Sequence, residues 1–181
     1  IHFWSPFYTM QAVIPEMRRR GEGRIVNISS IGGKVAIPHF APYCASKFAL
    51  VGLSNAVGVE LAKDGIAVTT VCPGLMRTGS HVNALFKGKN ELEFAWFSIG
   101  NALPVTSISA ESAAREIIEA CREGRAEAVL SVQAQLAAKI NALFPDAVSG
   151  IAGLVNQLLP GTGGIGENLA SGKESASFVS P

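Results

Sequence analysis

Two short apolar runs on either side of one long helical stretch constrain the fold of this chain more than any other feature. Residues 24–28 and 66–72 are rich in β-branched side chains and are bounded by Gly, Ser or Pro, which is typical of buried strands. Between them, residues 42–63 have the pattern of a long helix, and Pro42 suits its first turn. A strand, a helix and a strand in this order form a right-handed βαβ unit with parallel strands. The sequence therefore predicts an α/β fold.

Further elements extend this unit. The predicted helices cover residues 3–20, 109–123, 133–143 and 146–158, and a third strand covers 126–131. Residues 75–108 look irregular, and residues 160–181 are rich in Gly and Ser, so we expect the latter to form a disordered tail. The length of 181 residues suits a single domain. We therefore expect a domain over 1–131, two helices within 132–159 and the tail.

Composition narrows the function classes. The net charge is +1, which offers no electrostatic case for nucleic acid or acidic lipid as a partner. The three cysteines, Cys44, Cys72 and Cys121, are far apart, so we expect no disulfide framework, no metal site and a cytoplasmic location. No apolar run reaches the ~18 residues of a membrane-spanning helix. The first residues read as the inside of an element, so we expect the chain to be a fragment of a longer protein.

Tyr43 and Lys47 form the most informative pair of polar residues. Residues four apart in a helix lie on one face, one turn apart. A phenol has an ordinary pKa of ~10, and a nearby ammonium lowers it toward the range useful in general acid–base catalysis. Taken alone, the pair favours a surface tyrosine beside a solvated lysine.

The surrounding residues favour the catalytic interpretation. Ser30 follows the first predicted strand, Tyr43 lies near the start of the next helix, and Pro73-Gly74 follows the second strand, with Thr78 four residues beyond Pro73. In an open parallel sheet, ligands bind at the carboxyl ends of the strands. These residues therefore converge on one edge of one sheet.

In order and spacing, these motifs resemble the short-chain dehydrogenase/reductase family. The motifs are the run from Gly23 to Ser30, then Tyr43-x-Ala45-Ser46-Lys47, then Pro73-Gly74-x-x-x-Thr78. The resemblance implies a partial Rossmann-like, doubly wound parallel sheet and hydride transfer between NAD or NADP and an alcohol or carbonyl. Separately, we expect a homo-oligomer.

The resemblance assigns roles to individual residues. Tyr43 is then the catalytic acid–base, and Lys47 lowers its pKa and holds the nicotinamide ribose. Ser30 hydrogen-bonds the substrate oxygen, whereas Ser29 is structural. Pro73, Gly74 and Thr78 line the nicotinamide site and join Tyr43 and Lys47 in binding the cofactor. The segment that would choose between NAD and NADP is expected before residue 1.

The chain departs from the family in two places. The glycine-rich phosphate loop of the family would precede residue 1, so part of the dinucleotide site is expected outside this chain. His2 stands where the family usually has a catalytic Asn. It could hold a water that relays protons to Lys47 and would add a group that titrates near ~6.5. Alternatively, His2 is a neutral, hydrogen-bonded helix histidine.

Residues 79–101 correspond to the substrate lid of the family. Their aromatic side chains either line an apolar pocket or pack the segment onto the core; the candidates for substrate binding are Phe86, Phe94 and Trp96. His39 could border this pocket. Two other interpretations stay open: a non-catalytic binding or oligomerisation module of the same fold, and a peripheral membrane protein that uses the apolar faces of residues 133–158.

Overall fold

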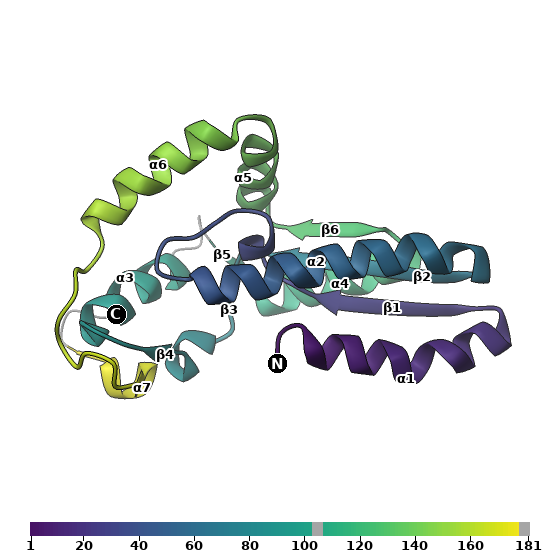
Figure 1. Cartoon of the computed structure of the whole chain (residues 1–181), viewed down its shortest axis with the longest axis horizontal. Helices are drawn as coiled ribbons and strands as arrows, with labels where there is room; N and C mark the ends of the chain where they lie inside the picture. The colour runs from purple at the N-terminus through teal and green to yellow at the C-terminus, as the bar shows by residue number, and fades with distance from the viewer. Residues whose placement is uncertain (103–106, 178–181) are drawn as a thin grey trace.

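A three-stranded parallel sheet forms the centre of the protein. The computed structural model describes residues 1–102 and 107–177. The sheet has the order β1 (Gly23–Ile28), β2 (Ile66–Pro73) and β6 (Glu127–Leu130) (Figure 1). Ile25 pairs with Val68 and Val71 with Ala128 in the two parallel ladders. The predicted parallel α/β fold is confirmed.

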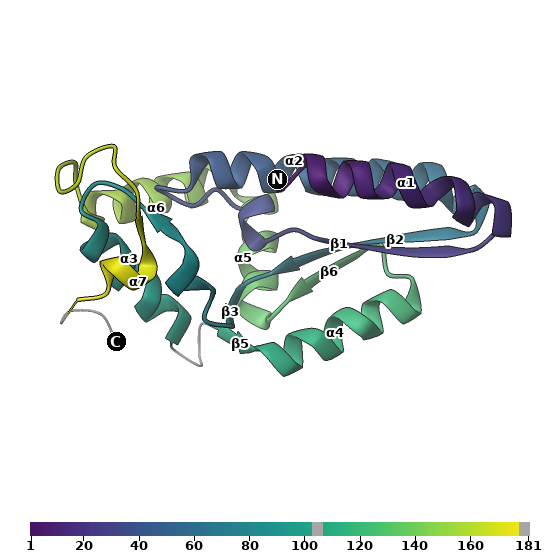
Figure 2. The same cartoon turned by 90° about the horizontal axis from the view of Figure 1, so that it is seen from below.

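Helices cover both faces of this sheet. The helices α1 (Trp4–Arg20) and α2 (Ala41–Leu61) lie on one face, and α4 (Ala110–Glu123) lies on the other, as Figure 2 shows. Residues Gly21 and Gly124 end α1 and α4 in the left-handed conformation, with φ of 72° and 65°, and their N–H groups bond the last turn. This layering is that of a doubly wound fold.

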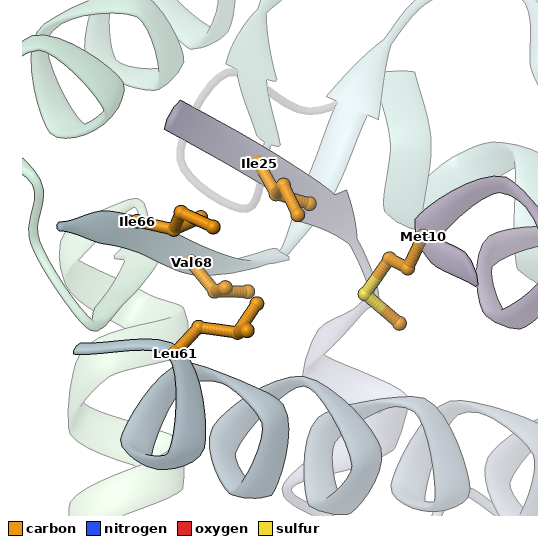
Figure 3. Close-up of a cluster of buried hydrophobic side chains, with 5 residues drawn as sticks. All are labelled: Met10, Ile25, Leu61, Ile66 and Val68. Carbon is orange, nitrogen blue, oxygen red and sulfur yellow. The ribbon is translucent and has the colours of Figure 1, made fainter. Parts of the chain in front are cut away.

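Two apolar clusters join the helices to the sheet. The first lies between α1, α2 and the strands (Figure 3); its buried members are Met10, Ile25, Leu61, Ile66 and Val68. The second lies under α4; its buried members are Val71, Ala113, Ala120, Ala128 and Leu130. Small alanines on α4 let that helix approach the strands closely. The core is therefore built from the strand runs that the sequence predicted.

The segment after β2 is more regular than we expected. It holds the strands and helices β3 (Leu75–Arg77), η3 (Ser80–Asn83), β4 (Leu85–Phe86), α3 (Asn90–Ala102) and β5 (Ser107–Ser109). Three residues of β3 pair in parallel with β5. The prediction of an irregular segment over 75–108 is therefore wrong for its described residues. The physical reason is that aromatic packing stabilises α3. Short 3-10 turns also occur at η1 (Ile31–Gly33) and η2 (Ala62–Asp64).

The two helices within residues 132–158 form an arm between the central sheet and the segment that holds α3. Helix α5 (Val132–Leu143) begins at Ser131, whose side chain accepts a bond from the Ala134 N–H, and α6 (Pro145–Leu158) follows at Pro145 (Figure 1). The apolar side chains on this arm are largely exposed: Leu136, Ile140, Leu143, Phe144, Ile151, Leu154, Val155 and Leu158. Among the described residues, no helix is long and apolar enough to cross a membrane.

The segment after α6 has regular structure within the described residues 160–177, where we expected a disordered tail. Strand β7 (Ala170–Ser171) pairs antiparallel with β4, and α7 (Gly172–Ser175) follows it. Ser171 and Glu174 form a capping box, and the Asn90 amide donates to Ser175 Oγ at 3.0 Å. Backbone pairing and capping hold this segment, which we call the C-terminal strap (160–177). A prediction based on missing apolar side chains could not detect such bonds; residues 178–181 lie outside the described part.

Candidate active site

Tyr43 lies in the first turn of α2, beside the carboxyl end of β1. Ser30 caps η1 at that end of the strand, and its Oγ accepts a hydrogen bond from the Gly32 N–H at 3.1 Å. Burial raises the pKa of the half-buried Tyr43 phenol, and the hydrogen bond from the Ser30 side chain opposes this rise. The phenol therefore keeps its proton at neutral pH, which suits it to protonate a carbonyl oxygen.

Lys47 lies one turn after Tyr43 on the same helix. Its ammonium donates to the Ile28 carbonyl at 3.1 Å and lies 5.7 Å from the centre of the Tyr43 ring. Burial lowers the pKa of Lys47. We expected Lys47 to lower the pKa of Tyr43, but in this structure burial of the phenol outweighs any such effect. The predicted closeness of Ser30, Tyr43 and Lys47 is nevertheless present.

Close backbone contact fixes α2 against the end of β1. The Ser29 hydroxyl donates to the Lys47 carbonyl at 3.0 Å, which gives Ser29 the structural contact that we expected. A Cβ on Gly33 would lie 2.7 Å from the same carbonyl oxygen, nearer than real Cβ atoms approach. Gly33 therefore allows η1 and α2 to touch, and this contact sets the position of Lys47 relative to Ser30.

His2 lies beside the tyrosine. Its Nδ1 is 3.1 Å from Ser46 Oγ, and its ring meets the Tyr43 ring edge-on with centres 5.4 Å apart. The Ser46 hydroxyl donates to the Tyr43 carbonyl at 2.7 Å, so Nδ1 is assigned as the donor to Ser46. Burial, followed by the Lys47 ammonium, lowers the pKa of His2. A neutral imidazole at pH 7 thus has Nε2 available as an acceptor next to the site.

The end of β2 approaches the same edge. Buried Pro73 closes the strand, and the Gly74 N–H donates to the Leu130 carbonyl at 3.3 Å. A Cβ at Gly74 would meet Ala134 and Ser131 at 3.1 Å, so this glycine allows close packing of α5. Thr78 is exposed just beyond β3. The backbone of Ser30 bonds the Cys72 thiol, and burial raises the pKa of that thiol to about 11, which leaves it protonated.

A cavity of about 640 Å³ opens beside Tyr43. Its walls come from three segments far apart in the sequence: residues 39–43, residues 84–93 and the C-terminal strap. Apolar lining is supplied by Phe40, Leu85, Phe86 and Leu169, among others. Tyr43 therefore lines a largely apolar space.

The predicted lid aromatics have different positions around this cavity. Phe86 lines it, as does His39. Phe94 is 3% exposed and packs on Phe86 and His81, behind the described lining. The Trp96 indole donates to Glu93 at 2.8 Å, and its ring packs edge-on against Phe40. Phe94 and Trp96 thus support the wall, whereas Phe86 forms part of it.

Two features of the site were missed by sequence reasoning. Strap residues from Pro160 to Leu169 line the cavity, although the strap is more than a hundred residues after Tyr43. Glu93 pairs with His39 across the cavity wall at 2.8 Å. The glycine-rich composition of the strap gave no sign that it lines a cavity. The position of Glu93 in the sequence likewise gives no sign that its partner is His39. Within the described residues no group of three His, Cys, Asp or Glu side chains could hold a metal ion.

Residues 1–87 match the family model described as short chain dehydrogenase. A putative ketoacyl reductase of Streptomyces coelicolor is 56% identical over 62 residues, which are 34% of this chain and 24% of that protein. A D-beta-hydroxybutyrate dehydrogenase of Rhizobium meliloti is 40% identical over 78 residues, 43% of this chain and 30% of that one.

Solved structures show the same fold. A short-chain dehydrogenase from Streptomyces avermitilis has a TM-score of 0.64 at 26% identity and covers 87% of this chain, which in turn covers 60% of that one. A short-chain dehydrogenase from Burkholderia cenocepacia, solved in complex with NADP, has a TM-score of 0.66 at 23% identity over 84% of this chain and 56% of its own. The chain thus matches about a quarter of the length of its curated relatives and more than half of these structures.

Proposed function

We propose that this chain is the catalytic part of a short-chain dehydrogenase/reductase, the family that its model match and its relatives support. The protein then transfers a hydride between NAD or NADP and an alcohol or carbonyl group. The observation that carries this proposal is the meeting of Ser30, Tyr43 and Lys47 at the carboxyl ends of β1 and β2.

The donor groups at this edge fit a nicotinamide ribose. The Tyr43 hydroxyl and the Lys47 ammonium lie on one face of α2, and both can bond sugar hydroxyls. We expect Pro73, Gly74 and Thr78 to border the nicotinamide from the end of β2. A bound nicotinamide dinucleotide supplies or accepts the hydride, while the protein supplies the proton and the orientation.

The proton chemistry then belongs to three side chains of this chain. Tyr43 donates its proton to the substrate oxygen in reduction and takes it back in oxidation. When substrate binds, the Ser30 hydroxyl turns its one hydrogen from the Tyr43 oxygen toward the substrate oxygen, while Oγ still accepts from the Gly32 N–H. Lys47 holds the nicotinamide ribose, and its positive charge stabilises the Tyr43 phenolate that forms after proton transfer.

His2 supports this chemistry as a holder of water. A neutral imidazole that donates from Nδ1 to Ser46 leaves Nε2 able to accept a bond from a water between it and Lys47. In reduction, the Tyr43 phenolate regains its proton from the Lys47 ammonium, and such a water would pass a proton from solvent to the neutral lysine.

The substrate is a carbonyl or alcohol with an apolar body. Phe40, Phe86 and Leu169 line the cavity that leads to Tyr43, and a volume of about 640 Å³ accommodates more than a few carbon atoms beyond the reacting group. We expect the enzyme to act in the cytoplasm as a homo-oligomer.

The test is Tyr43→Phe in the protein that carries residues 1–181, with Tyr8→Phe as its matched control. Tyr8 is exposed on α1, and the chain has two tyrosines. We expect Tyr43→Phe to lower kcat by at least ~10²–10⁴-fold with dinucleotide binding largely kept, because it removes the proton and keeps the ring. Tyr8→Phe should retain wild-type turnover.

Wild-type turnover in Tyr43→Phe would refute the assignment of the acid–base group. A wild-type protein that binds the dinucleotide without transferring hydride to any carbonyl would indicate the non-catalytic module instead.

A further inference from the structure

We infer that Glu93 is a positioning residue, which holds the wall of the substrate cavity against the catalytic tyrosine. This inference rests on the proposed function, because it concerns how the same site receives its substrate.

Both carboxylate oxygens of Glu93 are engaged. Oε1 lies 2.8 Å from His39 Nδ1, and Oε2 accepts from the Trp96 indole at 2.8 Å. The Glu93 side chain is 16% exposed, and it lies in the first turn of α3, where a negative charge is favoured by the helix dipole. The carboxylate therefore joins the lid helix to the loop that precedes α2.

The loop that Glu93 holds has an unusual backbone. His39 has a φ of +65°, in the left-handed region that residues other than glycine seldom adopt. Such a conformation persists where surrounding contacts over-determine it. The bond from His39 to Glu93 can hold this left-handed conformation in place, because it acts directly on His39.

Phe40 transmits this restraint to Tyr43. It follows His39 directly, and its ring lies 6.0 Å from the Tyr43 ring and 6.0 Å from the Trp96 ring, nearly perpendicular to both. Phe40 and Tyr43 also line the same cavity. Glu93 thus holds two neighbours of Phe40: His39, which precedes Phe40 in the chain, through the imidazole Nδ1, and Trp96, whose ring packs against Phe40, through the indole.

The experiment compares Glu93→Ala with Glu91→Ala in the protein that carries residues 1–181. Glu91 is an exposed acidic residue in the same helical turn, so it controls for the loss of a charge from α3. Glu93→Ala should lower kcat/KM for the carbonyl substrate about ten- to a hundredfold, because misplaced walls disturb substrate alignment. The KM for the dinucleotide should be unchanged, and Glu91→Ala should match the wild type.

Two further variants separate positioning from general stability. Glu93→Gln keeps an acceptor for Trp96 and should recover part of the lost kcat/KM, even if Glu93→Ala folds poorly. The double variant His39→Ala/Glu93→Gln should lose little more kcat/KM than the worse of the two single variants, since each substitution breaks the same contact between His39 and Glu93. Fully multiplicative losses would overturn the inference.

Hydrogen exchange provides a readout that does not need activity. Amides of residues 90–99 should exchange faster in Glu93→Ala than in Glu91→Ala. Unchanged exchange together with unchanged kcat/KM would overturn the role of Glu93. A wild-type protein without hydride transfer would refute the proposed function, and exchange would still decide whether Glu93 holds α3.

Discussion

Replacing Gly33 by alanine tests whether the contact between η1 and α2 sets the active site. The added Cβ would lie 2.7 Å from the Lys47 carbonyl oxygen and 2.8 Å from Ser29 Oγ. The carbonyl belongs to the backbone of α2 and cannot turn away. Forced overpacking costs about 1–3 kcal/mol, and losing the bond from Ser29 to that carbonyl costs about 1 kcal/mol more.

The expected loss of about 2–4 kcal/mol corresponds to a fall in Tm of roughly 4–16 °C for a chain of this size. Thermal unfolding followed by circular dichroism measures this fall in Tm. The value of kcat/KM should fall as well, because the added Cβ displaces Lys47. Gly52→Ala is the matched control: Gly52 is exposed on the same helix, and its Cβ would meet nothing within 4 Å. It should raise stability by about 0.5–1 kcal/mol. A Gly33→Ala protein as stable as the wild type would refute the reasoning.

Two further predictions concern His2 and the C-terminal strap. Because burial and Lys47 lower the pKa of His2, activity should hold through neutral pH and fall only below the ordinary histidine range, where the imidazolium repels Lys47. His2→Asn should remove that acid limb, and superimposable pH–rate profiles would make His2 an ordinary helix residue. Gly172→Ala would place a Cβ 2.1 Å from the His81 carbonyl oxygen, so it should raise the substrate KM and speed proteolysis within 160–177, unlike Gly150→Ala, which has open space. Wild-type KM and proteolysis would show that the strap does not close the cavity.

Much of the central fold could be predicted because its signals are local. Turn residues such as Gly21 and Gly124 mark where helices end, and Ser109 caps α4 through the Ser112 N–H at 3.1 Å. The segment around α3 was harder to predict. Helix α3 depends on packing with Phe86 and Phe40, which come from other segments, so its own residues looked irregular.

The sequence by itself determined the parallel βαβ unit and the order of Ser30, Tyr43 and Lys47 along it. Strand periodicity, the four-residue helical spacing and the shared carboxyl edge of a parallel sheet are properties of the local chain. Only the tertiary structure decided the raised pKa of Tyr43, because burial comes from the packing of distant segments. It alone also decided the pairing of Glu93 with His39 and the lining of the cavity by strap residues, since both bring together residues more than fifty positions apart in ways that no local pattern encodes.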